Sequence, residues 1–340
     1  MLISVIGLGC VKLIDKQTVF VLGAGASIPY GYPTGLELSN SIIEMIDFDE
    51  SQLSDEEIIA TKGTLAINAI HENFNNDLLK EFLRFKQGLE DSSRSSIDSF
   101  LENRSEFCDI GKRCIAWNLI RKEYNTISNK RDWFEYLHDS EFARGCNSLE
   151  DYSHNNIDFI TFNYDRVLEH NLITRLKGTY GNNEVECAEM IDDSFEIVHV
   201  HGKLNDLSWE SEDGRAYGQK PDSQEEWKKA ADGINIIHEK MGDKPFKEAI
   251  KLIKNAELIV FLGLNLHNTI NLDRIKINEN LEGKRIYTTV LGLTGPQRDD
   301  VNDYFDNQVS NLSRNISLQR PHVYEYGSIE LLKEEVRFRY

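Results

Sequence analysis

The sequence predicts an α/β protein built on a Rossmann-like, doubly wound parallel sheet with an inserted helical subdomain. The run TVFVL at 18–22 is apolar and β-branched without alternation, which is typical of a strand covered on both faces, and a glycine-rich turn follows it at once. Similar strand signals return later, each separated by enough chain for a crossover. They lie at 157–162, 195–200, 257–263 and 285–292.

The helical elements follow from local signals. Thr34 and Glu37 form the pattern of a capping box, so a helix should begin there. From about residue 55 to 139, apolar residues recur at helical spacing and no comparable strand interrupts them. We therefore expect a single domain, 1–340, in which 51–149 is a helical insertion and 1–50 with 150–340 form the Rossmann-like core.

Other segments of the core are less regular. The apolar N-terminus is expected to be a buried strand, and the C-terminal GSIELLKEEVRFRY a last helix. The polar stretch 207–247 is expected to be a loop-rich insertion before a helix near 247–253.

Composition and net charge argue against several classes of function. Lys and Arg total 38 against 57 Asp and Glu, and the net charge of -19 would repel nucleic-acid phosphates. The five cysteines contain no CxxC pair, which argues against a zinc site and fits a reducing cytoplasm. The apolar start of the chain is too short to span a bilayer. We expect a cytoplasmic protein that binds neither nucleic acid nor a membrane.

The first chemical motif is a glycine loop directly after the first strand. Its glycines would let the backbone approach a diphosphate, and the serine adds a hydroxyl. The third glycine of a GxGxxG motif is absent, because Ile28 stands there, so a purely structural tight turn stays open. The loop consists of Gly23, Ala24, Gly25, Ala26 and Ser27.

Two further motifs end the next strands. In TFNYD, Asn163 could hold water or a ribose hydroxyl and Asp165 could accept a hydrogen bond, although a simple Asx turn explains the pattern equally well. In HVHG, period-two alternation places both histidines on one face, with His201 at the ligand edge as a general base. His199 is expected to be a core residue, and a metal pair lacks a third ligand.

A last motif, FLGLNLH at 261–267, closes another strand with a glycine and two polar side chains. It could form the pocket for the distal nucleotide, and an ordinary βα turn is the alternative. Its candidate binding residues are Gly263, Asn265 and His267.

These segments, in this order, resemble the sirtuin-like domains of bacterial anti-phage defence proteins, which share the fold of sirtuin deacetylases but hydrolyse NAD. The first loop of that family reads like VLGAGASIPYGYPTG at 21–35. Its catalytic asparagine and histidine lie in motifs like TFNYD and HVHGKL, so Asn163 and His201 match them. Residues 96–120 resemble the family's insertion.

The resemblance implies NAD as the substrate, with its diphosphate on the glycine loop. Asn163 would position ribose and water, His201 would remove a proton, and Asp165 would orient the nicotinamide carboxamide. Thr34 and Gly202 are further expected contacts. Deacetylating sirtuins carry two CxxC pairs that hold zinc, whereas no cysteine follows Cys187 here. The resemblance therefore implies an NAD hydrolase without metal, with water as the acceptor.

An unregulated NAD hydrolase would empty its own cell of NAD, and no appended sensor domain is recognised in the sequence. The resemblance thus implies a homo-oligomer restrained until a separately encoded activator acts, either a ring-forming ATPase or a nucleic-acid-guided protein, in defence by abortive infection. Two alternatives stay open. One is a module that binds NAD or ADP-ribose without turnover, and the other is an ADP-ribosyltransferase.

Overall fold

The computed structural model describes most of the chain outside its N-terminus and several internal stretches. The described ranges are 13–46, 76–92, 94, 96–125, 132–236, 244–266, 270–281, 283–291, 293–312, 322–324 and 327–338. The expected N-terminal strand, part of the expected helical insertion and His267 lie outside these residues.

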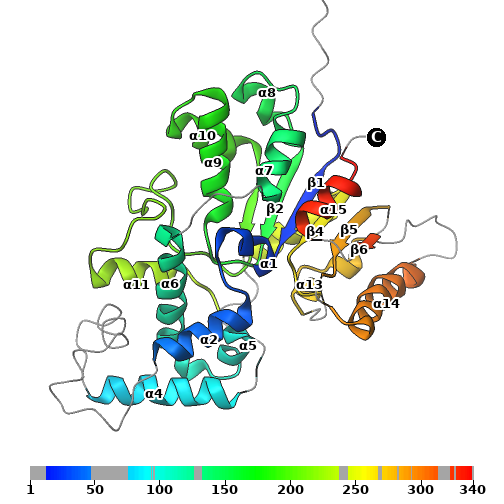
Figure 1. The fold of residues 1–340 in the computed structure, drawn as a ribbon. Coiled ribbons are helices and arrows are strands. Elements are labelled where there is room, and N and C mark those ends of the chain that lie inside the picture. Colours follow the sequence, from blue (N-terminus) through cyan, green and yellow to red (C-terminus); the bar gives the residue numbers. More distant parts are fainter. Residues whose placement is uncertain are drawn as a thin grey trace, which may run out of the picture.

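A six-stranded, all-parallel sheet forms the centre of the fold (Figure 1). Its order, β3-β2-β1-β4-β5-β6, is that of a doubly wound sheet, so the predicted fold class is confirmed. The strand order reverses between β1 and β4. The strands are β1 Thr18–Leu22, β2 Ile157–Thr161, β3 Ile197–His199, β4 Leu258–Leu262, β5 Arg285–Thr289 and β6 His322–Tyr324.

Helices connect and cover these strands. Those before β2 are α1 Ala24–Ser27, α2 Gly35–Met45, α4 Asn76–Asp91, α5 Ile97–Leu101, α6 Cys108–Asn125, α7 Trp133–Leu137 and α8 Leu149–Ser153. Those after it are α9 Val167–Tyr180, α10 Glu184–Ser194, α11 Gln224–Asp232, α12 Lys244–Asn255, α13 Ile270–Arg274, α14 Gly295–Leu312 and α15 Ser328–Glu334.

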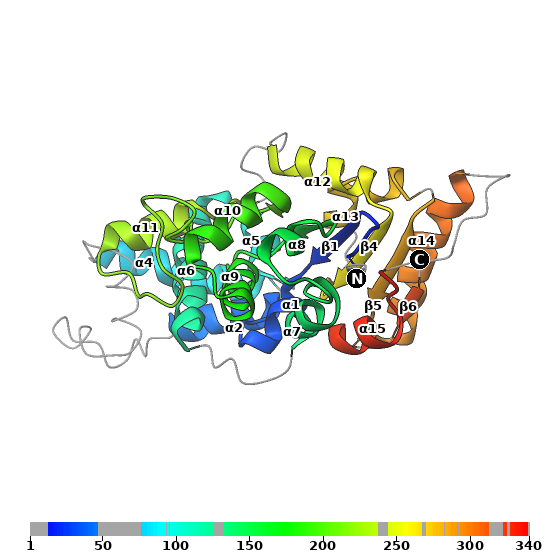
Figure 2. The ribbon, with the colours of Figure 1, turned by 90° about the horizontal axis from the view of Figure 1, so that it is seen from above.

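Side-chain alternation along the strands divides the core into two apolar layers. On β1, Phe20 and Leu22 pack with α7, α9 and α15, whereas Val19 and Val21 pack with α12 and α14. Figure 2 shows α12 and α9 on opposite sides of the sheet. Because both faces are covered, β1 and β4 are buried at every position and show no amphipathic period.

The helices α2, α4, α5, α6 and α11 form a lobe beside the sheet (Figure 1). Within the described part of 76–153 every regular element is helical, as the sequence predicts. The lobe also takes in α2 and α11 from outside 51–149, and α7 packs against α15. The domain boundaries stay a prediction.

Several local expectations need correction. The predicted strand 195–200 is shorter and ends at His199, where the chain turns. The stretch 207–247 contains α11, which begins at a serine cap, and α12 begins at Lys244 and not near residue 247. The edge strand β6 was not predicted, because three residues carry no usable period.

Candidate functional site at the carboxyl edge of the sheet

The glycine loop after β1 and the turn after β4 pack directly on each other. The Gly25 amide donates to the Gly263 carbonyl at 2.8 Å, and Gly263 has a φ of +64°. A Cβ on Gly263 would lie 2.0 Å from the Ala26 nitrogen, and one on Gly23 or Gly25 would lie 2.7 Å from this turn. These glycines are therefore required where the two turns meet, at the point of reversed strand order.

A hydrogen-bonded chain of side chains joins the ends of β1 and β2. The Asn163 amide donates to the Gly23 carbonyl at 2.9 Å and to Ser27 Oγ at 3.0 Å. Ser27 Oγ in turn donates to Asp165 Oδ2 at 2.8 Å. The structure thus brings together three residues that the sequence placed on two separate motifs.

Asp165 is buried, and burial raises its pKa to about 6, although hydrogen bonds from Ser27 and the Val167 amide oppose the shift. The Val167 bond, at 3.2 Å, has the geometry of the Asx turn that the sequence left open. Asp165 therefore accepts a main-chain bond at the first residue of α9 as well as one from Ser27.

His201 lies in an aromatic environment. Its ring centroid is 5.5 Å from that of Phe162, 6.5 Å from Tyr164 and 6.0 Å from Phe246. Burial lowers its pKa to about 4, partly opposed by a hydrogen bond with Asn271. The imidazole is consequently neutral at pH 7, the state a general base needs, but it is a weaker base than an exposed histidine.

His199 and His201 do not share a face, which corrects the sequence prediction. His199 contacts Glu169 of α9, whereas His201 contacts Phe246 of α12 across the sheet. The alternation fails because β3 ends at His199 and the next residues form a turn. Gly202, with a φ of +68°, lets this turn meet Gly233.

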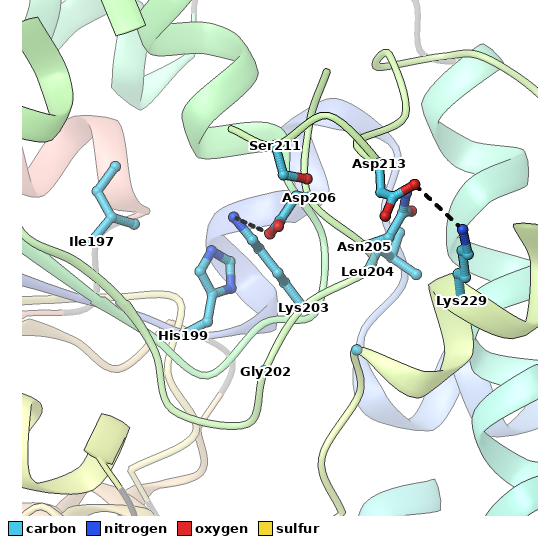
Figure 3. A pocket seen from close by; sticks show the side chains of 11 residues that line it. Ile197, His199, Gly202, Lys203, Leu204, Asn205, Asp206, Ser211, Asp213 and Lys229 are labelled. Atoms are coloured by element: carbon cyan, nitrogen blue, oxygen red, sulfur yellow. Dashed lines mark ion pairs between the residues drawn. The ribbon is translucent and has the colours of Figure 1, made fainter. Parts of the chain in front are cut away.

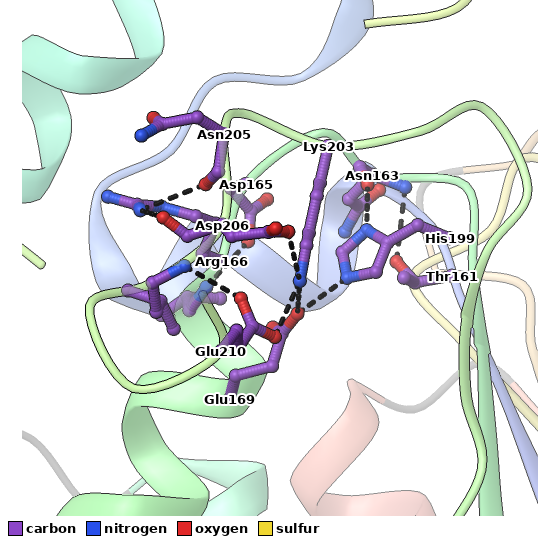
Figure 4. A network of polar contacts seen from close by, with 12 residues as sticks. Thr161, Asn163, Asp165, Arg166, Glu169, His199, Lys203, Asn205, Asp206 and Glu210 are labelled. Atoms are coloured by element: carbon purple, nitrogen blue, oxygen red, sulfur yellow. Dashed lines mark hydrogen bonds and ion pairs between the residues drawn. The ribbon is translucent and has the colours of Figure 1, made fainter. Parts of the chain in front are cut away.

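A polar network surrounds His199 (Figure 4). Its Nε2 lies 2.7 Å from Glu169 Oε1, and Lys203 lies 3.5 Å from the same oxygen and 2.6 Å from Glu210 Oε1. Sequence reasoning missed Glu169 entirely. The available signal was an acidic residue in the first turn of a helix, only four positions after Asp165.

A cavity of about 440 Å³ opens beside this network (Figure 3). His199, Gly202 and Lys203 line it, whereas the glycine loop does not. The charged groups around it are paired with one another, including Lys203 with Glu210 and Lys229 with Asp213.

Two other residues predicted to contact the nucleotide, Thr34 and Asn265, lie outside this hydrogen-bonded chain. Thr34 caps α2, and its hydroxyl donates to Glu37 Oε2 at 2.9 Å, so the predicted capping box is confirmed. Asn265 is exposed next to the β4 turn. Within the described ranges, no group of three His, Cys, Asp or Glu side chains is arranged to hold a metal ion. Each helix in those ranges is too short or too polar to cross a membrane.

No protein-family model and no curated protein matches the chain. Among solved structures, it is similar to a Sir2 homologue in complex with NAD, with 12% identity over 95% of this chain and 89% of that chain and a TM-score of 0.41. It is also similar to a Sir2 protein with an inhibitor, 2′-O-acetyl-ADP-ribose and a deacetylated peptide, with 15% identity, coverage of 94% and 92%, and a TM-score of 0.37. Because both scores are below 0.5, the fold assignment rests on the strand order described above.

Proposed function

We propose that this protein hydrolyses NAD at the bond between nicotinamide and ribose, releasing nicotinamide and ADP-ribose. The observation that carries the proposal is the hydrogen-bonded chain from Asn163 through Ser27 to Asp165. It lies at the carboxyl edge of a doubly wound sheet, next to the reversal of strand order where dinucleotides bind in such folds. The motif resemblance at Asn163 and His201 supports the same reaction.

In the proposed reaction the C1′–N bond breaks and its electron pair leaves with nicotinamide, which neutralises the ring. Water then adds to C1′ and loses a proton. The Asn163 amide oxygen would hold the ribose or the water, while its nitrogen stays bonded to Gly23 and Ser27. His201 is neutral at pH 7 and would accept the proton.

The remaining predicted contacts belong to this proposal. The diphosphate would lie along the glycine loop, and Ser27 could donate to it only after releasing Asp165. Asp165 would orient the nicotinamide carboxamide. Thr34, Gly202, Gly263, Asn265 and His267 would complete the nucleotide site.

A wider role follows from the motif resemblance alone. Continuous hydrolysis would exhaust cellular NAD, so we propose that assembly into a homo-oligomer and a separate activator protein restrain the enzyme. In this proposal, activation during phage infection depletes NAD and stops the host cell.

Nicotinamide release from NAD tests the proposed function. Purified protein is incubated with NAD and the products are separated by chromatography, and cellular NAD is measured after expression in bacteria. Asn163→Ala should lower release about 100-fold, because a displaced water or ribose costs roughly that factor. Asn163→Asp keeps the shape of the side chain but removes the two bonds that its amide nitrogen donates. Nicotinamide release by this variant should fall by a similar factor.

The matched control is Asn182→Ala, which removes a partly exposed asparagine whose side chain binds Glu186 at the surface. It should hydrolyse NAD at the wild-type rate. Wild-type turnover by Asn163→Ala would contradict the assigned site. NAD binding without nicotinamide release, both in vitro and in cells, would favour the binding module, and label from NAD on a macromolecule would favour the transferase.

A further inference from the structure

His199 lies between two hydrogen-bond acceptors. Its Nδ1 is 3.0 Å from the Asn163 carbonyl oxygen, and its Nε2 is 2.7 Å from Glu169 Oε1. A main-chain carbonyl can only accept, so Nδ1 carries a hydrogen. If Glu169 is ionised, Nε2 must carry one as well, and the two side chains form an ion pair.

Glu169 faces a positive charge that does not depend on His199, because Lys203 Nζ lies 3.5 Å from its Oε1. Glu169 is 1% exposed, and burial alone would raise its pKa, but His199 and Lys203 together hold the pKa below its usual range. The carboxylate therefore sits in a nearly solvent-free position on the first turn of α9, whereas its imidazole partner borders the cavity. In such surroundings a charged hydrogen bond resists rotation of the imidazole.

The imidazole holds the main chain of the proposed catalytic asparagine. The Asn163 nitrogen donates to Thr161 Oγ1 at 3.1 Å, and its carbonyl accepts from His199. The main chain of Asn163 is thus held on both sides of its Cα, as Figure 4 shows. The side-chain amide projects from this backbone toward Gly23 and Ser27, so a fixed main chain supports that direction.

We propose that His199, oriented by Glu169, is a positioning residue that acts on the reaction through Asn163. The inference rests on the proposed function for its kinetic consequence. Neither side chain needs to touch the substrate. The structural position of His199 thereby differs from that of an ordinary core histidine, whose removal would affect stability without any dependence on Asn163.

Kinetics of variants separate positioning from a structural role. His199→Ala should lower kcat about tenfold and change KM less than about threefold, because an interaction through Asn163 affects the reacting geometry more than binding. Residues that act as one unit show non-additive effects. The double variant His199→Ala with Asn163→Ala should therefore be no slower than Asn163→Ala alone.

Two further variants test the details. Glu169→Gln keeps the size and one acceptor but removes the charge, so it should be milder, about threefold in kcat, and it replaces His199→Ala if that protein does not fold. Asp206→Asn alters a half-exposed partner of Lys203 near the same cavity and should leave kcat unchanged.

The cavity provides a chemical test. His199 lines it, so free imidazole can reach the space left in His199→Ala. Millimolar imidazole should restore part of the lost kcat in His199→Ala and none in Asn163→Ala. An additive double variant, or a defect in KM alone, would overturn the inference.

A spectroscopic measurement keeps the inference testable if no nicotinamide is released. With ¹⁵N-asparagine labelling, the Asn163 side-chain signal is assigned by its loss in Asn163→Ala. Its hydrogens should exchange with solvent at least several-fold faster in His199→Ala, at an unchanged melting temperature. Unchanged exchange would overturn the positioning role, whereas failure of the proposed function alone would leave this difference intact.

Discussion

His199 and His201 are separated by one residue, yet their surroundings differ in charge and in the groups that contact them. His199 bonds to a carboxylate and a main-chain carbonyl, and a cavity opens beside it. His201 packs among Phe162, Tyr164 and Phe246. The end of β3 between the two residues sends one side chain toward α9 and the other toward α12.

These different surroundings suit the two imidazoles to different chemical roles. The two ring nitrogens of His199 face a carbonyl oxygen and a carboxylate oxygen, so both nitrogens serve as hydrogen-bond donors. Apolar surroundings favour the neutral imidazole of His201, which can accept a proton. In the proposed reaction, one histidine holds a neighbour in place and the other serves as the base.

The largest expected effect concerns turnover. His201→Ala should lower nicotinamide release about 1,000-fold, because it removes the proposed base, whereas His199→Ala should cost only about tenfold. Steady-state kinetics of both proteins measure this contrast. The assignment of roles breaks if His199→Ala is the slower of the two.

The charged surroundings of His199 lie near a second, buried group of charges formed by Arg166 and Glu123. Arg166 and Glu123 are fully buried with Nη2 and Oε2 2.7 Å apart, and Arg166 Nη1 also binds the carbonyls of Asn205 and Asp206 beside the cavity. Glu123→Gln should lower the free energy of unfolding by about 3 kcal/mol, because it leaves buried guanidinium groups uncompensated. Denaturant unfolding measures the change.

A surface pair is the control for that experiment. Arg104 and Glu106 are 2.6 Å apart but roughly half exposed, so Glu106→Gln should unfold at the wild-type denaturant concentration. Equal effects of the two substitutions would show that the buried cluster gives no extra stability to the side of the sheet that holds His199.

The smallest expected effect is a pH dependence of the folding stability that arises from His201 in its apolar surroundings. The pKa of His201 falls from 6.5 to about 4 on folding, so the unfolded chain takes up a proton first as pH falls. The contribution of neutral His201 to stability is complete above pH 6.5 and is lost between pH 6.5 and about 4. Relative to wild type, His201→Leu should gain stability across that window.

Thermal unfolding at several pH values measures this difference. His154→Leu, a substitution of an exposed histidine, should show no such gain. A constant difference between His201→Leu and wild type from pH 7 to pH 4 would mean that His201 is not held neutral by its surroundings.

The strands that lie between two helical layers were the most predictable part of the fold. TVFVL and its two neighbouring strands are buried at every position and mostly apolar, and β1, β2 and β4 begin where the sequence places them or one residue later. The capping box at Thr34 was predictable because it involves only four adjacent residues. The three-residue β6 gave no such signal.

The candidate site was less predictable. Asn163, Asp165 and Ser27 could each be singled out because polar residues follow buried strands, but their mutual bonds join residues about 140 positions apart. The sequence period placed both histidines on one face, which is wrong, because a period is informative only while the strand continues. The role of Glu169 depends on the packing of α9 against the end of β3, which no local pattern contains.

By itself, the sequence determined the parallel sheet, the glycine turn and the polar residues at strand ends, since each depends on local pattern and burial. Tertiary structure alone decided that the glycines serve the contact between two turns and that His199 holds the Asn163 peptide. Both outcomes depend on which strands become neighbours. That order is set by the packing of the whole core, and no short segment of the sequence contains it.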